Sequence, residues 1–251
     1  MTKQKHFYLI RGLIREKAHW GNFITHLQEI FPKALITTID IPGAGDYFSS
    51  PSPLTVKEMV EEMRRDFLRF KTAHEDTHLI AISLGGMIAI EWMKKYPQDF
   101  AWATLINTSF GGVSPIHHRL RPEAFLHLLK VPLLSGRKKE SHILELVTNH
   151  KDIFSETLDH WEIIQKERPV SLANTFKQLF AAGIFRSGDF TPPIPLQLIA
   201  STHDRMVSVE CSRAIARKWN VPLEEHPTGG HDLTVDDPKW VAERIKLSTE
   251  S

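Results

Sequence analysis

The sequence predicts an α/β protein: a mostly parallel central sheet flanked by helices, with one helical insertion. Three observations favour this fold class. Short apolar runs alternate with segments of helical periodicity, as expected for parallel strands joined by helical crossovers. The strand pattern stops between about residues 113 and 187 and returns near Leu196. The chain has 251 residues and an apolar fraction of 41%, which is enough for one large domain with a sizeable core.

The first part of the chain contains two predicted strands and one helix. Residues 6–10 form an apolar run that ends at Arg11-Gly12, and apolar side chains then recur at helical spacing from Trp20 to Phe31. A β-branched run over 34–39 predicts the second strand. It ends in the turn-rich segment 40–46, which contains proline, two glycines and two aspartates.

The next elements have clear boundary signals. Thr55 and Glu58 form a T-x-x-E capping box, which predicts the start of an amphipathic helix. A short apolar strand over 79–82 follows, and then a helix from about Gly85 to Tyr96 that is apolar almost all round and should therefore be buried. Another strand is expected over 101–106.

The segment 113–187 is expected to be a helical cap inserted into the core. It contains several helical spacings and no run that stands out as a strand. Strands return at 196–200 and near 221–225, and Asp237-Pro238 marks the start of a last helix. We therefore divide the chain into a core made of 1–112 and 188–251, and an insertion made of 113–187.

The most informative segment is HLIAISLGGMIAIEW, in which Ser83 lies between a buried strand and a buried helix. Its neighbours two places away, Ala81 and Gly85, are both small, as a sharp strand-to-helix turn requires. Such a turn exposes the hydroxyl and brings the first helical N–H groups beside it, where they can stabilise an oxyanion. The segment resembles the G-x-S-x-G nucleophile elbow of the α/β-hydrolase superfamily, with Ala81 in place of the first glycine.

The resemblance implies a catalytic triad in the order serine, acid, histidine. Asp204 and Val207 match the D-x-x-V loop after a late strand, which makes Asp204 the expected acid. The glycine-rich loop before the last helix carries His231, the expected base. Asp232 is a rival acid, but adjacent residues rarely turn their side chains onto each other. The other place where some members carry the acid is occupied here by Asn107, which has no charge.

The same resemblance places an oxyanion hole at the backbone N–H groups of Leu13 and Leu84. The family turn is normally His-Gly, and here it is Arg11-Gly12. Two interpretations of Arg11 are open. It makes local structural bonds, for example to Asp40 or Asp46, or it faces the pocket and binds an anionic part of the substrate.

Composition excludes several classes of function. The chain carries 31 basic and 30 acidic side chains, so its net charge of +1 gives no field that would attract nucleic acid. No run of consecutive apolar residues is long enough to span a bilayer. The apolar run near the N-terminus is too short to be the core of a signal peptide. With a single cysteine, Cys211, the chain forms no intramolecular disulfide, which allows a reducing compartment. We expect a cytoplasmic protein.

The insertion holds six histidines, and we weighed them as metal ligands. These are His117, His118, His127, His142, His150 and His160. Helical zinc ligands usually occur as i, i+4 pairs, a spacing that the last three histidines do not have. We expect no metal and no organic cofactor.

The sequence predicts a serine hydrolase, carboxylesterase-like, that cleaves a carboxylic ester, a thioester or a lactone through an acyl-enzyme on Ser83. The expected partner is a small-molecule acyl substrate, and the sequence does not give the oligomeric state. Two alternatives stay open. The same triad serves C–C hydrolases, acyltransferases and lyases of this fold, and the fold also occurs in non-catalytic ligand-binding proteins.

Overall fold

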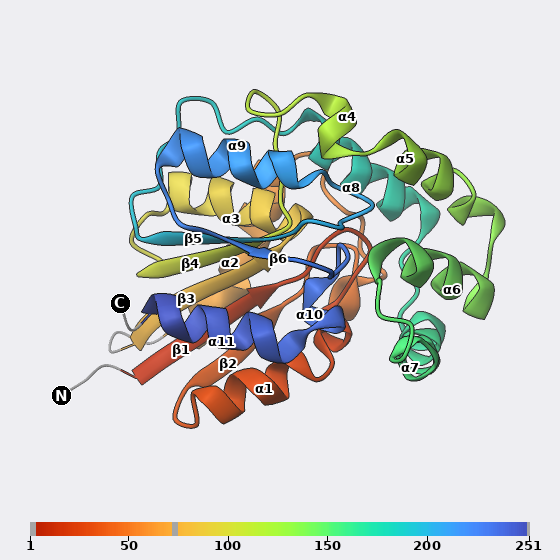
Figure 1. Cartoon of the computed structure of the whole chain (residues 1–251), viewed down its shortest axis with the longest axis horizontal. Helices are drawn as coiled ribbons and strands as arrows, with labels where there is room; N and C mark the ends of the chain where they lie inside the picture. Colours follow the sequence, from red (N-terminus) through yellow and green to blue (C-terminus); the bar gives the residue numbers. More distant parts are fainter. Residues whose placement is uncertain (1–3, 72–74, 250–251) are drawn as a thin grey trace.

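The computed structural model describes residues 4–71 and 75–249, and its central sheet is parallel throughout (Figure 1). The strands are β1 (Gln4–Ile10), β2 (Leu35–Ile39), β3 (Glu75–Ile82), β4 (Trp102–Ile106), β5 (Leu196–Ser201) and β6 (Leu223–His226). They lie in the order β2-β1-β3-β4-β5-β6, and each neighbouring pair is parallel. The predicted fold class is therefore confirmed.

Helices cover both faces of the sheet. One face carries α1 (Phe23–Ile30) and α11 (Pro238–Thr249), and the other carries α2 (Val56–Phe70), α3 (Leu84–Lys95) and α9 (Val209–Trp219) (Figure 1). The alternation of side chains along β1 shows why both faces are dry. Phe7 and Leu9 belong to the apolar cluster under α1, whereas Tyr8 and Ile10 belong to the cluster under α2 and α3.

Three helices begin with favourable residues, and those at Thr55 and Pro238 are the ones that the sequence predicts. The Thr55 hydroxyl accepts a hydrogen bond from the Glu58 backbone N–H at 3.2 Å, which caps α2. Ser208 caps α9 in the same way through the Glu210 N–H. Because α11 starts at Pro238, the missing N–H of proline falls where a helix has no intrahelical partner for it.

The register brings the carboxyl ends of the strands to one edge. Ile10 lies opposite both Ile39 and Ala81, and Ile82 lies opposite Ile106. Loops that follow β1, β3 and β5 therefore open at the same edge, which is where parallel α/β sheets place their ligands.

Between β4 and β5 the chain forms helices. They are α4 (Ile116–Arg119), α5 (Pro122–Leu128), α6 (Gly136–Val147), α7 (Phe154–Glu167) and α8 (Leu172–Ile184). In Figure 1, α5, α6 and α7 lie beyond the carboxyl ends of the strands. A third apolar cluster joins these helices to Ile14 and Ala44 of the core. None of the described helices is long and apolar enough to span a membrane.

Candidate active site

Ser83 lies at a strained turn between β3 and α3, with φ of +56° and ψ of −119°. Close packing around the turn explains the small neighbours that the sequence shows. A Cβ atom built on Gly85 would lie 2.5 Å from the carbonyl oxygen of Ile10, and one on Gly12 would lie 3.0 Å from the Ser83 Cβ. Only glycine fits at position 85 without moving the β1 backbone.

His231 and Asp204 are brought to Ser83 by loops after other strands. The Ser83 Oγ lies 3.0 Å from the His231 Nε2, and the His231 Nδ1 lies 2.7 Å from the Asp204 Oδ2. Asp204 and His231 are 2% and 6% exposed, so this polar chain is almost completely shielded from water. The three side chains form one continuous hydrogen-bonded line.

The Asp204 carboxylate is held by its own loop. Its Oδ1 accepts hydrogen bonds from the backbone N–H groups of Met206 at 2.7 Å and Val207 at 2.9 Å. These bonds leave Oδ2 for His231. The aspartate therefore has the fixed position that a D-x-x-V turn provides.

Opposing effects act on the pKa of the buried His231. Burial alone would lower it, and this is the largest single effect. The charge of Asp204, the hydrogen bond to Asp204 and the charge of Asp232 act together in the other direction, while Arg11 adds a smaller lowering effect. The net result is that the pKa of His231 is raised above the ordinary value of 6.5.

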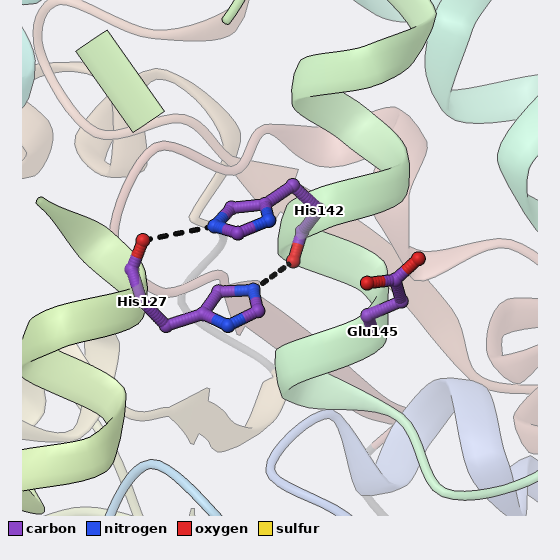
Figure 2. A group of neighbouring side chains, drawn as sticks. All are labelled: His127, His142 and Glu145. Atoms are coloured by element: carbon purple, nitrogen blue, oxygen red, sulfur yellow. Dashed lines mark hydrogen bonds between the residues drawn. The ribbon is translucent and has the colours of Figure 1, made fainter. Parts of the chain in front are cut away.

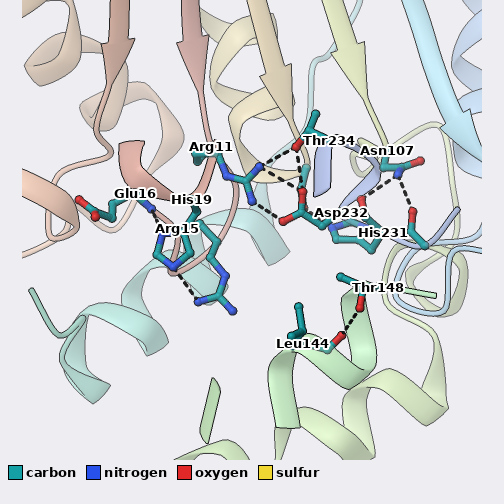
Figure 3. A network of polar contacts seen from close by, with 12 residues as sticks. Arg11, Arg15, Glu16, His19, Asn107, Leu144, Thr148, His231, Asp232 and Thr234 are labelled. Carbon is teal, nitrogen blue, oxygen red and sulfur yellow. Dashed lines mark hydrogen bonds and ion pairs between the residues drawn. The ribbon is translucent and has the colours of Figure 1, made fainter. Parts of the chain in front are cut away.

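Asn107 follows β4 at a positive φ of +46° and holds the histidine loop in place. Its Nδ2 donates to the carbonyl oxygen of His231 at 2.8 Å and more weakly to that of Gly230 at 3.3 Å. Its Oδ1 accepts from the Ser201 N–H at 2.8 Å. Figure 3 shows the Asn107 amide beside His231. Asn107 therefore positions the histidine loop, a role for which the sequence gives no local signal.

The two residues expected to supply the oxyanion donors are Leu84, which follows Ser83 directly, and Leu13, which lines the same cavity as Ser83. Leu84 is the first residue of α3, so its N–H is one of those that have no intrahelical partner. Leu13 follows Gly12, at which an added Cβ would lie 3.0 Å from the Ser83 Cβ, so the chain passes close to the serine there. The next residue, Ile14, has a φ of +53° and donates its N–H to the Gln178 Oε1 of α8 at 2.9 Å. A helix of the 113–187 segment therefore fixes the loop that carries Leu13.

Arg11 makes structural bonds, although to a different carboxylate from those named as examples above. It is 2% exposed, and it pairs with Asp232 and donates to the Thr234 hydroxyl at 2.9 Å (Figure 3). Its guanidinium also lies over the Trp20 ring. The suggestion of Asp40 or Asp46 was wrong because the side chain turns toward the loop of His231. This pairing also directs Asp232 away from the imidazole.

Asp40 instead organises the turn that follows β2. Its carboxylate accepts backbone hydrogen bonds from Lys17 at 2.7 Å and Asp46 at 3.0 Å. Burial raises its pKa to about 6, although those two hydrogen bonds act in the other direction.

A cavity of about 40 Å³ adjoins the reactive groups, and Ser83, His231 and Arg15 are among the residues that line it. The ion pair of Arg11 and Asp232 also lines it, and the remaining side chains of the wall are apolar. The helical segment supplies Leu128, Ile143 and Val147, and the core supplies Leu13, Ile14, Ile82 and Met206. A site with an apolar wall and few polar groups is typical of small-molecule binding.

One group of potential metal ligands occurs among the described residues, away from Ser83. Ring nitrogens of His127 and His142 and a carboxylate oxygen of Glu145 all lie within 4.8 Å of one another (Figure 2). The imidazoles stack with centroids 3.5 Å apart, and each Nε2 donates to the backbone carbonyl of the other histidine. A ring nitrogen binds a metal ion that lies in the plane of its own ring. Because the two rings are stacked face to face, they could share one ion only if the stack came apart. The two histidines instead hold α5 against α6.

Comparisons with known proteins agree with this fold. A family model described as "Alpha/beta hydrolase family" matches residues 8–244. Monoacylglycerol lipase ABHD6 of Mus musculus is 22% identical over 254 residues, which cover 94% of this chain and 73% of that protein.

Solved structures share the fold at low sequence identity. The esterase RhEst1 from Rhodococcus sp. ECU1013 has a TM-score of 0.78 at 13% identity, covering 99% of this chain and 91% of that chain. The 2-hydroxy-6-oxo-6-phenylhexa-2,4-dienoate hydrolase from Rhodococcus sp. strain RHA1 has a TM-score of 0.73 at 15% identity, with the same coverage.

Proposed function

Because this chain belongs to the alpha/beta hydrolase family, we propose that it is a serine hydrolase that cleaves a carboxylic ester, with thioesters and lactones as related substrates. One observation carries the proposal: the unbroken hydrogen-bonded line from the Ser83 Oγ through His231 to Asp204. A nucleophile, a base and an orienting acid in that order are what acyl transfer through serine requires. The name of the mouse relative, a monoacylglycerol lipase, supports an ester substrate.

The proposed reaction has two steps. The His231 Nε2 removes the Ser83 proton while the Ser83 Oγ attacks the ester carbonyl, and the N–H groups of Leu13 and Leu84 stabilise the oxyanion. His231 then gives the proton to the leaving alcohol. Water, activated by His231, cleaves the acyl-enzyme and releases the acid. Asp204 keeps the Nδ1 proton in place throughout, so that Nε2 is the basic atom.

The helical segment 113–187 is proposed to act as a cap that sets substrate choice. Leu128, Ile143 and Val147 of this segment share the cavity wall with Ser83, which supports that role. Since the cavity is small, we expect short acyl groups. The single cysteine forms no intramolecular disulfide, and we propose that the enzyme works in the cytoplasm.

Fluorophosphonate labelling tests the proposal directly. The wild-type chain should be labelled at Ser83 and should hydrolyse nitrophenyl esters of short acids, whereas Ser83→Ala should do neither while keeping its fold by circular dichroism. A panel of esters of increasing acyl length should show a preference for the shorter acids. A folded wild-type protein that is neither labelled nor active on any ester would contradict a serine hydrolase.

A further inference from the structure

Arg15 lies two residues after Leu13 and is held rigidly against the helical segment. It is 7% exposed. Its guanidinium carbon lies 4.0 Å from the ring centroid of Trp161 in α7, and its Nη1 donates to the Glu140 Oε2 of α6 at 2.9 Å. Figure 3 shows the guanidinium extending from the core loop toward α6. Stacking and ion pairing together fix the orientation of the whole group.

One edge of this guanidinium is free. The Arg15 Nη2 is buried and has no hydrogen-bond partner among the residues that the structure describes. Arg15 also lines the cavity that contains Ser83. A buried donor without a partner lowers stability, so native proteins rarely leave one beside a cavity unless something else binds there.

We propose that the Arg15 Nη2 is a substrate-binding group, which donates a hydrogen bond to an uncharged oxygen, keto or hydroxyl, on the acyl part of the ester. The inference rests on the proposed function, because the acyl group must react at Ser83 to lie within hydrogen-bonding distance of Arg15. The apolar part of the cavity wall then contacts the carbon chain of the acyl group, and Arg15 supplies a polar contact. Arg11 and Asp232 also line the cavity, but they are paired with each other.

The surrounding charges favour an uncharged oxygen over a carboxylate. Glu140 already neutralises Arg15, and Asp232 neutralises Arg11. Burial, together with Arg15 and Arg11, lowers the pKa of His19 well below its ordinary value, so this imidazole adds no positive charge. Lys139 is not among the cavity-lining residues. A carboxylate in the cavity would therefore be buried without a counter-ion of its own, which is costly.

Matched esters test the inference. We would compare kcat/KM for the nitrophenyl ester of pentanoic acid with esters that carry a keto group at successive carbons of the same chain, and with the half-ester of succinic acid. Each value is divided by the rate of hydrolysis in free hydroxide, which removes differences in intrinsic reactivity. Wild type should prefer one keto position by on the order of 10-fold to 100-fold, the usual effect of a hydrogen bond from a charged donor.

Variants assign that preference to Arg15. Because Arg15→Met alone would leave Glu140 buried and unpaired, the test uses the double variant Arg15→Met/Glu140→Leu, which replaces the ion pair by apolar groups. In this double variant, the ratio of the corrected kcat/KM of the keto ester to that of the alkyl ester should fall to about 1. Arg168→Met/Glu16→Gln is the matched control, because Glu16 is also buried and would lose its partner in Arg168→Met alone. It removes the charges of another Arg–Glu pair between core and helical segment, at two residues outside the cavity lining, and the ratio should persist.

A third variant tests the charge argument. Glu140→Gln keeps a hydrogen-bond partner for Arg15 but removes the neutralising charge. The kcat/KM of the succinic half-ester should therefore rise relative to that of the keto ester. A wild-type ratio near 1 at every keto position, or a wild-type preference for the half-ester, would overturn the inference. If Ser83 is still labelled by fluorophosphonate in that experiment, the serine hydrolase proposal stands; if it is not labelled, the proposed function itself fails.

Discussion

At the scale of single residues, Asn107 links two strand ends to the loop that carries the proposed base. Its side chain bonds the Ser201 N–H on one side and the carbonyl oxygen of His231 on the other. Because the amide has both a donor and an acceptor, it can satisfy both groups at once, which neither an aspartate nor an apolar residue could do.

Asn107→Ala should lower both stability and turnover. Removing the amide leaves buried backbone groups unpaired, so the free energy of unfolding in urea should fall by about 1–3 kcal/mol. The loop of His231 would also be less well placed, so kcat should fall more than KM rises. Asn107→Asp is the comparison: it keeps the acceptor for Ser201 but sets a negative charge beside two carbonyl oxygens. An unchanged kcat in Asn107→Ala would show that the loop of His231 keeps its position without the Asn107 amide.

A second residue-scale prediction separates the two aspartates. Asp204→Asn should reduce kcat on the order of 10⁴-fold, as in measured triads, because the imidazole loses its orienting acid. Asp232→Asn should be much less damaging to kcat. It should move the acid limb of kcat/KM to lower pH, since the Asp232 charge helps to raise the pKa of His231. The reverse pattern would identify Asp232 as the acid.

At the scale of secondary structure, α8 fastens the helical segment to the loops of the core. The completely buried Gln178 accepts from the Ile14 N–H and donates to the Ser52 hydroxyl at 3.2 Å. One turn earlier, the Asn174 amide donates to the carbonyl oxygens of Gly43 and Ser50. Two amide side chains on one face of a helix thus hold the loops after β1 and β2.

Gln178→Leu should therefore alter catalysis from outside the triad. The Ile14 N–H would lose its partner, which costs about 1–3 kcal/mol of stability and frees the loop of Leu13. If Leu13 donates to the oxyanion, kcat should fall with little change in KM. Gln178→Glu, which keeps an acceptor for Ile14, should recover part of the lost kcat. A loss of stability without a change in kcat would limit Gln178 to a structural role.

Local and long-range features differed in how well the sequence predicted them. The turn at Ser83, the cap at Thr55 and the start of α11 follow from neighbouring residues, and the structure has them where the pattern placed them. The stack of His127 on His142 joins two helices, so the spacing of histidines within one helix does not predict it. For the same reason the pairing of Arg11 with Asp232, 221 positions apart, had no local signal.

At the scale of the whole molecule, the acid limit of stability should depend on His19. This imidazole is buried, and burial, with the charges of Arg15 and Arg11, lowers its pKa well below 6.5. The unfolded chain therefore binds a proton at His19 more readily than the folded chain does. The contribution of His19 to the free energy of unfolding is fully present above the pKa that His19 has in the unfolded chain, and it is lost as the pH falls below that value.

His19→Gln should reduce that loss. The free energy of unfolding, measured by urea titration at several pH values between neutrality and about pH 4, should change less with pH in the variant than in wild type. His26→Gln, at a partly exposed histidine of α1, is the control for removing a histidine elsewhere. Equal slopes in wild type and His19→Gln would show that another group governs acid unfolding.

The two ends of the helical segment meet where it leaves the sheet. Gly111 and Arg186 form a bridge, and the Gly111 N–H donates to the carbonyl oxygen of Phe185 at 3.0 Å. A stretch of chain that departs and returns at one point can lengthen, shorten or be exchanged without displacing β4 or β5. Such a geometry lets a helical segment of different length join the sheet at Gly111 and Arg186, provided that the contacts of α8 with the core loops are kept.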